Sequence, residues 1–171
     1  MNLVYFSLGS NIGDKRKNLK NAIELLKKNN VKILKMSSIY ETEPVCYKNQ
    51  PYFYNACIKT KTTLKPLDLL CKIKKIEKQL GRVKTKKWGP RIIDIDILFY
   101  NNIIFKDRHL IIPHPEIVKR NFILIPLYEI EKNFIHPEKK LKIKDLINLN
   151  KLKDKVIKIG DLNDSFSLYK H

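Results

Sequence analysis

The first hundred residues alternate between segments with the hydrophobic pattern of strands and segments with that of helices. Runs rich in β-branched and aromatic residues predict strands at residues 3–8, 31–40, 53–63 and 92–100. Glycine, asparagine and proline bound these runs, as expected where strands end in turns. The pattern therefore predicts four strands, with a connecting element after the first and another after the third.

Two amphipathic helices account for these connections. Residues 15–29 carry apolar side chains at i, i+4 and i+7 with lysines opposite, and Asp14 is a suitable N-cap. The second helix begins near Pro66, a residue favoured in the first turn, and ends at Gly81. The order of elements predicts an α+β, ferredoxin-like β-α-β-β-α-β core, in which helices cover an antiparallel sheet.

The pattern after residue 100 is weaker. A turn at Asn101-Asn102 predicts a hairpin from the fourth strand back through residues 103–105. Residues 122–130 are expected to form a short helix that Pro126 interrupts.

The C-terminal part adds a weakly amphipathic segment from about residue 141 and then a polar tail. For the tail, at residues 150–171, two alternatives remain open: a sheet-edge strand around 156–159, or no regular structure. No linker divides the chain, so we expect a single domain over residues 1–171 with its core at about 2–147.

Composition changes this picture little. The net charge of +18 suggests nucleic acid as a ligand, but the lysines are scattered along the chain without forming a block. Abundant Lys, Asn and Ile is also what an AT-rich genome encodes, and the excess charge favours anionic small molecules in either case. We therefore expect small-molecule partners and no nucleic acid, and we expect a monomer.

The chain also lacks signals of export. No apolar run approaches the roughly 20 residues of a membrane-spanning helix, and the N-terminus lacks the basic region of a signal peptide. Three cysteines, Cys46, Cys57 and Cys71, are an odd number without metal-ligand spacing. Reduced thiols and a cytoplasmic location are expected.

Arginine is rare and unevenly placed. Of 35 basic residues only five are arginine, and four of these lie between residues 82 and 120. Because a guanidinium holds phosphate with a planar fork that lysine lacks, these positions are candidates for phosphate binding. Chance clustering of five residues is the alternative.

An acidic pair lies within the fourth strand. Residues two apart share a face of a strand, so Asp94 and Asp96 project together while Ile93, Ile95 and Ile97 face the opposite side. Two carboxylates on an apolar strand favour a hard cation such as Mg²⁺. The alternatives are a solvated pair or a pair neutralised by lysine.

Motifs in order along the chain resemble the 6-hydroxymethyl-7,8-dihydropterin pyrophosphokinase family of folate synthesis. The most specific is Trp88-Gly89-Pro90-Arg91-Ile92-Ile93-Asp94-Ile95-Asp96, and the others are Gly9-Ser10-Asn11, Tyr40-Glu41-Thr42-Glu43-Pro44, Asn55-Ala56, Gly81-Arg82, Pro113-His114 and Arg120 with Phe122. The resemblance covers about residues 2 to 147. It implies an ATP-dependent diphosphokinase that transfers pyrophosphate to a pterin alcohol and releases AMP.

The resemblance also implies roles for individual residues. Asp94 and Asp96 would bind two Mg²⁺ ions, and Arg82 and Arg91 would join them as catalytic residues. ATP would be bound by Lys74, Glu77, Lys84, Trp88, Arg91, His114 and Arg120. Whether Arg108 or His109 also contacts ATP is left open. The pterin would contact Thr42, Pro44, Val45, Phe53, Asn55 and Phe122, and the loops at 43–51 and 82–90 would close over both substrates.

Two other classes of function fit parts of the sequence. An RNA-binding sheet shares the element order and the positive charge, but the strands lack paired exposed aromatics. A metal-dependent phosphotransferase or nuclease could use the acidic pair, although no water-activating residue is evident. No Walker-type G-x-x-x-x-G-K-[ST] motif is present.

Overall fold

The computed structural model describes residues 1–150 and 154–162. Its centre is an antiparallel sheet in which the strand order is β5-β1-β4-β3-β8, with β2 also paired to β4. The strands are β1 (Asn2–Ser10), β2 (Val31–Met36), β3 (Ser38–Thr42), β4 (Phe53–Thr62), β5 (Asp94–Tyr100) and β8 (Val156–Asp161). The predicted ferredoxin-like core is confirmed, because its last strand pairs with its first.

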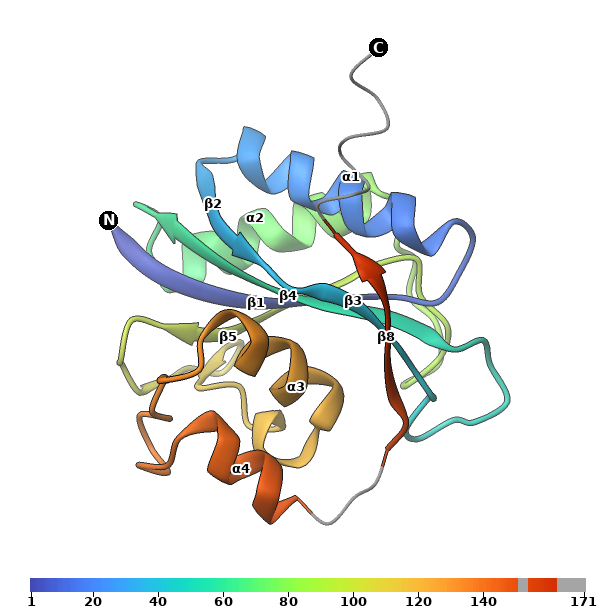
Figure 1. The fold of residues 1–171 in the computed structure, drawn as a ribbon. Coiled ribbons are helices and arrows are strands. Elements are labelled where there is room, and N and C mark those ends of the chain that lie inside the picture. Colours follow the sequence, from blue (N-terminus) through green and yellow to red (C-terminus); the bar gives the residue numbers. More distant parts are fainter. Residues whose placement is uncertain (151–153, 163–171) are drawn as a thin grey trace.

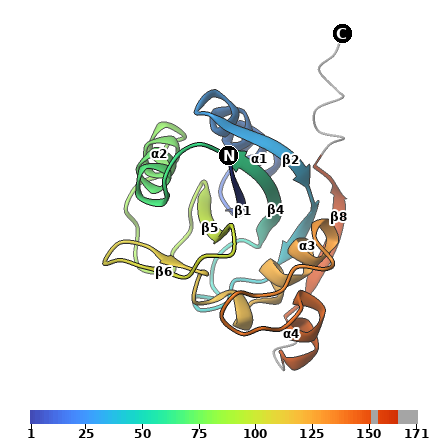
Figure 2. The same ribbon diagram turned by 90° about the vertical axis from the view of Figure 1, so that its left-hand side faces the viewer.

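Helices cover both faces of the sheet (Figures 1 and 2). One face carries α1 (Lys15–Lys28) and α2 (Pro66–Gln79), and the other carries α3 (Asn121–Ile130) and α4 (Ile143–Leu149). The predicted caps are present: the Asp14 carboxylate accepts a hydrogen bond from the Lys17 amide at 3.0 Å, and Gly81 follows α2 with a φ of +93°.

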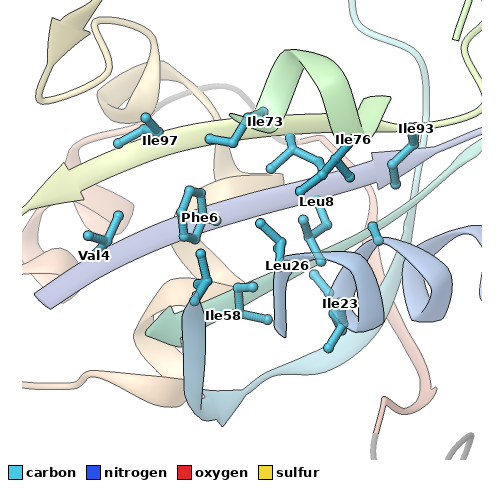
Figure 3. Packing of buried hydrophobic residues seen from close by; sticks show 14 of the residues in the cluster. Val4, Phe6, Leu8, Ile23, Leu26, Ile58, Ile73, Ile76, Ile93 and Ile97 are labelled. Atoms are coloured by element: carbon cyan, nitrogen blue, oxygen red, sulfur yellow. The ribbon is translucent and has the colours of Figure 1, made fainter. Parts of the chain in front are cut away.

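The core divides according to the alternation of side chains along β1. Val4, Phe6 and Leu8 point toward α1 and α2, where they meet Ile73 and other aliphatic residues (Figure 3). Tyr5 points the other way, into a second cluster beneath α3 and α4. Because β1 is buried on both faces, the helices α1 and α2 and the helices α3 and α4 pack on opposite sides of the same sheet.

One predicted strand is interrupted. Residues 31–40 form two strands, β2 and β3, which pair with successive parts of β4 on either side of Ser37. The Ser37 hydroxyl accepts a hydrogen bond from the Cys57 amide at 2.9 Å, and the Ser37 amide bonds to the Cys57 carbonyl at 2.9 Å. The sequence pattern did not predict this break. The Ser37 hydroxyl takes the place of a backbone acceptor in the pairing with β4, and the hydrophobic period does not reveal such an exchange.

The predicted hairpin after Asn101-Asn102 is wrong. The Asn101 amide and side chain bond to Leu3 of β1, which turns the chain away from the edge of β5. The following strand, β6 (Phe105–Lys106), pairs instead with β7 (Ile111–Ile112), ahead of the short 3-10 helix Ile117–Lys119. The fourth predicted strand also begins later than expected, at Asp94.

Two further expectations are resolved in the C-terminal part. The helix α3 continues through Pro126 as one element. Of the alternatives for the tail, an edge strand is found: β8 pairs with β3, whereas residues 151–153 and 163–171 lie outside the described residues. Among the helices of the described residues, none is long and apolar enough to cross a membrane.

Candidate active site

The motif residues meet at the end of the sheet remote from the N-terminus (Figure 1). Strands β1 and β3 end there and β4 and β5 begin there, so four strand ends contribute side chains. The register places Gly9 between Asp94 on one side and Asn55 on the other. Gly9 lies 46 positions from Asn55 and 85 from Asp94 along the chain, so sheet geometry, and not flexible loops alone, holds these residues together.

A pocket opens at this end of the sheet. It contains two phenylalanines, the acidic pair, two arginines and the residues of the loop after β3. Its lining is Ser7, Gly9, Thr42, Glu43, Val45, Cys46, Gln50, Phe53, Asn55, Trp88, Arg91, Asp94, Asp96, Arg120, Phe122 and Ile123. Such a mixture of aromatic walls and a few convergent polar groups is typical of a small-molecule site.

The two aspartates project from β5 as the alternation predicts, while Ile93, Ile95 and Ile97 are buried on the other face. The Asp94 carboxylate is held between two arginines. Its Oδ1 accepts a hydrogen bond from Arg82 Nη1 at 2.7 Å, and its Oδ2 accepts one from Arg91 Nη1 at 3.1 Å. Both arginines were selected from the sequence as candidates for phosphate binding, and both bond to Asp94.

Asp96 lies in a more demanding electrostatic environment. Burial and the neighbouring Asp94 carboxylate raise the pKa of Asp96, while the charges of Lys74 and Arg120 oppose that rise. Because burial is the first cause, the raised pKa means that the negative charge of Asp96 is poorly solvated, and the Asp94 carboxylate adds to this. A cation bound here would relieve it.

The donor set fits Mg²⁺ in particular. Two carboxylates project from a rigid strand, and among the described residues no group of three or more His, Cys, Asp or Glu side chains is placed so that it could hold a metal ion. Magnesium is commonly held by one or two carboxylates, with water and substrate phosphates completing its octahedron. The site therefore suits a metal that arrives with a phosphorylated ligand.

Glu77 of α2 holds the acidic strand in place. Only 2% of the residue is exposed, and its Oε1 accepts hydrogen bonds from Arg82 Nη1 at 2.6 Å and from the Ile95 amide at 2.9 Å. Its Oε2 accepts from Lys74 Nζ at 3.1 Å. Burial alone would lower the pKa of Arg82, but Asp94 and Glu77 outweigh this and raise it. The guanidinium is thereby fixed beside the acidic pair.

A second pocket adjoins the first across Asp96. It is lined by apolar residues of α2, β5 and the β6–β7 ribbon and by several basic groups: Leu70, Lys74, Ile95, Asp96, Ile97, Arg108, His109, Leu110, Ile111, His114 and Pro115. A third, more basic hollow lies between α2 and the loop at 82–90 and includes Lys74, Glu77, Arg82, Lys84 and Trp88. Together the hollows surround the acidic pair with cations.

His114 is prepared to donate a hydrogen bond. Its Nδ1 accepts from the Glu116 amide at 3.2 Å, which assigns the ring proton to Nε2. Burial, followed by the charge of Arg120, lowers the pKa of His114. The neutral ring therefore offers an N–H group at the border of the second pocket.

Guanidinium groups lie over the aromatic rings of the site. The Arg91 guanidinium carbon is 5.6 Å from the centre of the Phe53 ring, and that of Arg120 is 5.7 Å from the rings of both Trp88 and Phe122. These contacts link the aromatic walls of the first pocket to the cations around the acidic pair.

The polar edge of the first pocket is formed by Asn55. Its Nδ2 donates to the Thr42 hydroxyl at 2.6 Å, which joins β4 to β3. A Cβ atom on Gly9 would lie 2.8 Å from Asn55 Oδ1 and 3.8 Å from the Phe53 ring. Gly9 is therefore required for the position of the carboxamide.

Most of the sequence-selected residues gather around these three hollows. Thr42, Val45, Phe53, Asn55 and Phe122 line the first, whereas Pro44 is buried beside it without lining it. The others lie around the acidic pair or in the adjoining hollows: Lys74, Glu77, Arg82, Lys84, Trp88, Arg91, Asp94, Asp96, His114 and Arg120.

Two residues that sequence reasoning missed connect the loops. The carboxamide of Asn11, which is fully buried, accepts from the Arg91 amide and donates to Gln50 Oε1 and the Pro51 carbonyl, at 2.9 to 3.0 Å. Gln50 Nε2 in turn donates to the Trp88 carbonyl at 2.9 Å. The only signal for Asn11 was its place in the Gly9-Ser10-Asn11 motif, and Gln50 gave none.

Fold and site thus define a ferredoxin-like α+β protein with an acidic, arginine-flanked site between two pockets. The family model described as 7,8-dihydro-6-hydroxymethylpterin-pyrophosphokinase (HPPK) matches residues 5–132. The chain belongs to this family of pyrophosphokinases, and the resemblance noted in the sequence is confirmed.

Similar proteins include both short and long chains. The 2-amino-4-hydroxy-6-hydroxymethyldihydropteridine pyrophosphokinase of Aquifex aeolicus is 45% identical over 90% of this chain and 95% of its own length. The folic acid synthesis protein fol1 of Pneumocystis carinii is 47% identical over 82% of this chain. The chain spans only 19% of that relative and 28% of the FOL1 protein of Dictyostelium discoideum.

Solved structures show the same fold. The HPPK-DHPS of Plasmodium falciparum superimposes with a TM-score of 0.69 at 22% identity, over 86% of this chain and 43% of that one. At this identity the likeness establishes the ferredoxin-like fold and carries no assignment of individual residues.

Proposed function

We propose that the chain transfers pyrophosphate from ATP to 6-hydroxymethyl-7,8-dihydropterin and releases AMP, as a step of tetrahydrofolate synthesis. Family membership supports the class of reaction. The observation that carries the proposal is the shared border at Asp96, which lines both the aromatic pocket and the basic pocket next to it. Two substrates bound in these pockets would meet at the acidic pair.

The aromatic pocket fits the pterin. A flat bicyclic ring would stack against Phe53 and Phe122, and its hydrogen-bonding edge would face Asn55 and backbone groups at Thr42 and Val45. Pro44 supports the start of this loop from its buried position. The hydroxymethyl group would then point toward β5.

The neighbouring hollows fit ATP. The nucleoside would lie in the pocket beside His114, where the Nε2–H group can donate to a phosphate oxygen. Lys74, Lys84, Trp88 and Arg120 would surround the triphosphate. Glu77 acts from beneath, through Arg82 and Lys74, because its oxygens already accept bonds from them.

Asp94 and Asp96 would hold two Mg²⁺ ions. When bound, these ions would neutralise the phosphate oxygens and orient the pterin hydroxyl. Arg82 and Arg91, which bond to Asp94 in this structure, would be free to turn to the triphosphate once metal replaces them at the carboxylate.

The transfer is an in-line displacement at the β-phosphorus of ATP. A bond forms from the pterin oxygen to the β-phosphorus while the hydroxyl proton is lost to water. The bond from that phosphorus to the α,β-bridging oxygen breaks, and AMP departs with its electron pair. The chain's own contribution is positioning and charge stabilisation, since this chemistry needs no covalent intermediate. The arginines would stabilise the charge that spreads over the phosphoryl oxygens.

The decisive test is an AMP-release assay with ATP, Mg²⁺ and 6-hydroxymethyl-7,8-dihydropterin. We expect pterin-dependent AMP formation that is lost in Asp94→Ala and in Asp96→Ala, while both variants keep the thermal unfolding midpoint within a few degrees of the parent. AMP formation that does not depend on pterin would contradict the proposal.

A further inference from the structure

We propose that the C-terminal strand β8, anchored by Arg16 of α1, is a positioning element of the pterin pocket. It holds the end of β3 that carries Thr42 and so sets pterin affinity without touching either substrate. The inference rests on the proposed function for its substrate, and it adds a role for a strand outside the family-matched residues 5–132.

The argument begins with the pairing of β3. From Ser38 to Thr42 the whole of β3 is aligned with β8, whereas only Tyr40 to Thr42 are aligned with β4. Val156, the first residue of β8, lies opposite Thr42. The outer strand therefore begins beside the residue that bonds to Asn55 and leads into the pocket loop.

The other end of β3 has a separate anchor. The Glu129 carboxylate of α3 accepts bonds from the amide and hydroxyl of Ser38 and, at 2.6 Å, from the Tyr40 hydroxyl. These contacts fix the part of β3 that is remote from Thr42. At the pocket end, Tyr40 to Thr42 are paired with β4 on one side and with β8 on the other, so β8 is one of the two strands that support that end.

Arg16 ties β8 to the body of the molecule. Its Nη2 donates to the Ile159 carbonyl at 3.0 Å, and a Cβ atom on Gly160 would lie only 3.0 Å from the same nitrogen. Beyond them, Leu162 is fully buried in the core on the α1 side of the sheet. The strand is thus fixed at its C-terminal end, and it pairs with β3 along its length.

This arrangement also explains why residue 16 is an arginine. The guanidinium reaches a carbonyl of β8 and lies 5.8 Å from the centre of the Tyr54 ring on β4. Lysine is poorly suited to pack on an aromatic ring and donate to a backbone oxygen at the same time, because its ammonium group is not planar. Arg16 is the one arginine outside residues 82–120.

The test compares Arg16→Ala with Lys17→Ala in the full-length protein. Both remove one positive charge from the first turn of α1, but Lys17 is exposed. We expect Arg16→Ala to raise the dissociation constant of 6-hydroxymethyl-7,8-dihydropterin about three- to tenfold, because only part of the free energy of the lost charge-assisted hydrogen bond to Ile159 is transmitted to the pocket. The affinity for a non-hydrolysable ATP analogue with Mg²⁺ should change less than twofold, as should both affinities in Lys17→Ala.

Two more measurements keep the outcome clear. Amide hydrogen exchange at Glu41 and Thr42 should accelerate in Arg16→Ala, and also in Ile157→Pro, which places a proline opposite Glu41 near the start of β8. Gly160→Ala should also weaken pterin binding, because the φ of +158° strains an alanine in β8 and the new Cβ atom would lie 3.0 Å from Arg16 Nη2.

Unchanged pterin affinity in both Arg16→Ala and Ile157→Pro would overturn the proposal, whatever the exchange rates show. An equal loss of pterin and nucleotide affinity would overturn it as well, since that is general destabilisation. If the parent protein forms no AMP with pterin, the proposed function fails; faster exchange at Thr42 in Arg16→Ala would still show that β8 supports β3.

Discussion

Gly9 shows how a missing side chain can shape a site. It lies in register between Asp94 and Asn55, and its lack of a Cβ leaves the space that the Asn55 carboxamide occupies. The arginines show the opposite case, in which large side chains are matched to charge. Arg82 and Arg91 each contact Asp94, and Arg82 is also held by Glu77 of α2.

Gly9→Ala is expected to weaken pterin binding. The new methyl group would push Asn55 Oδ1 away from 2.8 Å and misplace the edge that reads the ring. Loss of about one hydrogen bond corresponds to roughly a 5- to 30-fold rise in the pterin KM, with little change in the ATP KM. In Asn55→Ala the same exchange should add little, because the group that it displaces is gone. A similar additional loss in that background would contradict the explanation.

Replacing either site arginine by lysine should lower kcat. Lysine keeps the charge but cannot hold phosphate with a planar fork, so Arg82→Lys and Arg91→Lys are each expected to reduce kcat roughly 10- to 100-fold. Steady-state AMP release at saturating substrates measures this. Lys28→Arg, on the exposed end of α1, is the charge-conserving control and should leave kcat unchanged. Full activity in both lysine variants would show that charge alone suffices.

At the scale of elements, rigid strands carry the acidic pair and two loops carry the remaining contacts. The loops are not independent, because Asn11 and Gln50 connect the end of the loop at 43–51 to the backbone at Trp88 and Arg91. We interpret this network as a link through which occupancy of one pocket affects the loop over the other. The 41% exposure of Trp88 leaves room for further closure.

Trp88 is the single tryptophan, so its fluorescence would report on such a closure. Acrylamide quenching of its fluorescence should decrease when the pterin and a non-hydrolysable ATP analogue are both bound. In Gln50→Ala the ligand-free protein should be quenched more strongly than the parent, because the bond to the Trp88 carbonyl is absent. Lys48→Ala, an exposed change in the same loop, is the control. Equal quenching with and without ligands would refute loop closure over Trp88.

At the scale of the whole molecule, two helical layers on one sheet bury polar groups away from the site. His136 packs edge-on against Phe99, and its Nδ1 accepts bonds from the Glu138 and Lys139 amides at 3.2 and 3.1 Å. Burial lowers the pKa of His136; the charge of Glu138 opposes this and that of Lys139 adds to it. Protonation would add a buried charge and remove an acceptor.

His136 should therefore lower the stability of the fold on mild acidification. Because the folded pKa of His136 lies below the unfolded value of 6.5, the unfolded chain binds more protons as the pH falls through that value, and the free energy of unfolding decreases. Asp96 acts in the opposite direction, because its raised pKa of about 7 lets the folded protein bind a proton first. Urea titrations of the parent and of His136→Asn from pH 7.5 to 5 separate the two contributions. His136→Asn keeps an acceptor for the two amides and should reduce the slope by up to about 1.4 kcal/mol per pH unit. An identical slope in the variant would exclude His136 as the source.

The sequence by itself determined the local structure and the chemistry of the chain. Strand and helix periods, the caps at Asp14 and Gly81, and the common face of Asp94 and Asp96 all depend on neighbours within a few residues. Local patterns of this kind reflect backbone geometry, which is the same wherever the segment packs.

Only the tertiary structure decided which segments meet. The break at Ser37, the failed hairpin after Asn101, the pairing of β8 with β3 and the buried position of Glu77 all depend on partners far along the chain. A side chain's sequence neighbours do not specify such partners, because pairing at a distance is fixed by the packing of the whole core. For the same reason, the hydrogen bonds that join Asn11, Gln50 and Trp88 came from the fold, although Asn11 and Trp88 each belong to a motif.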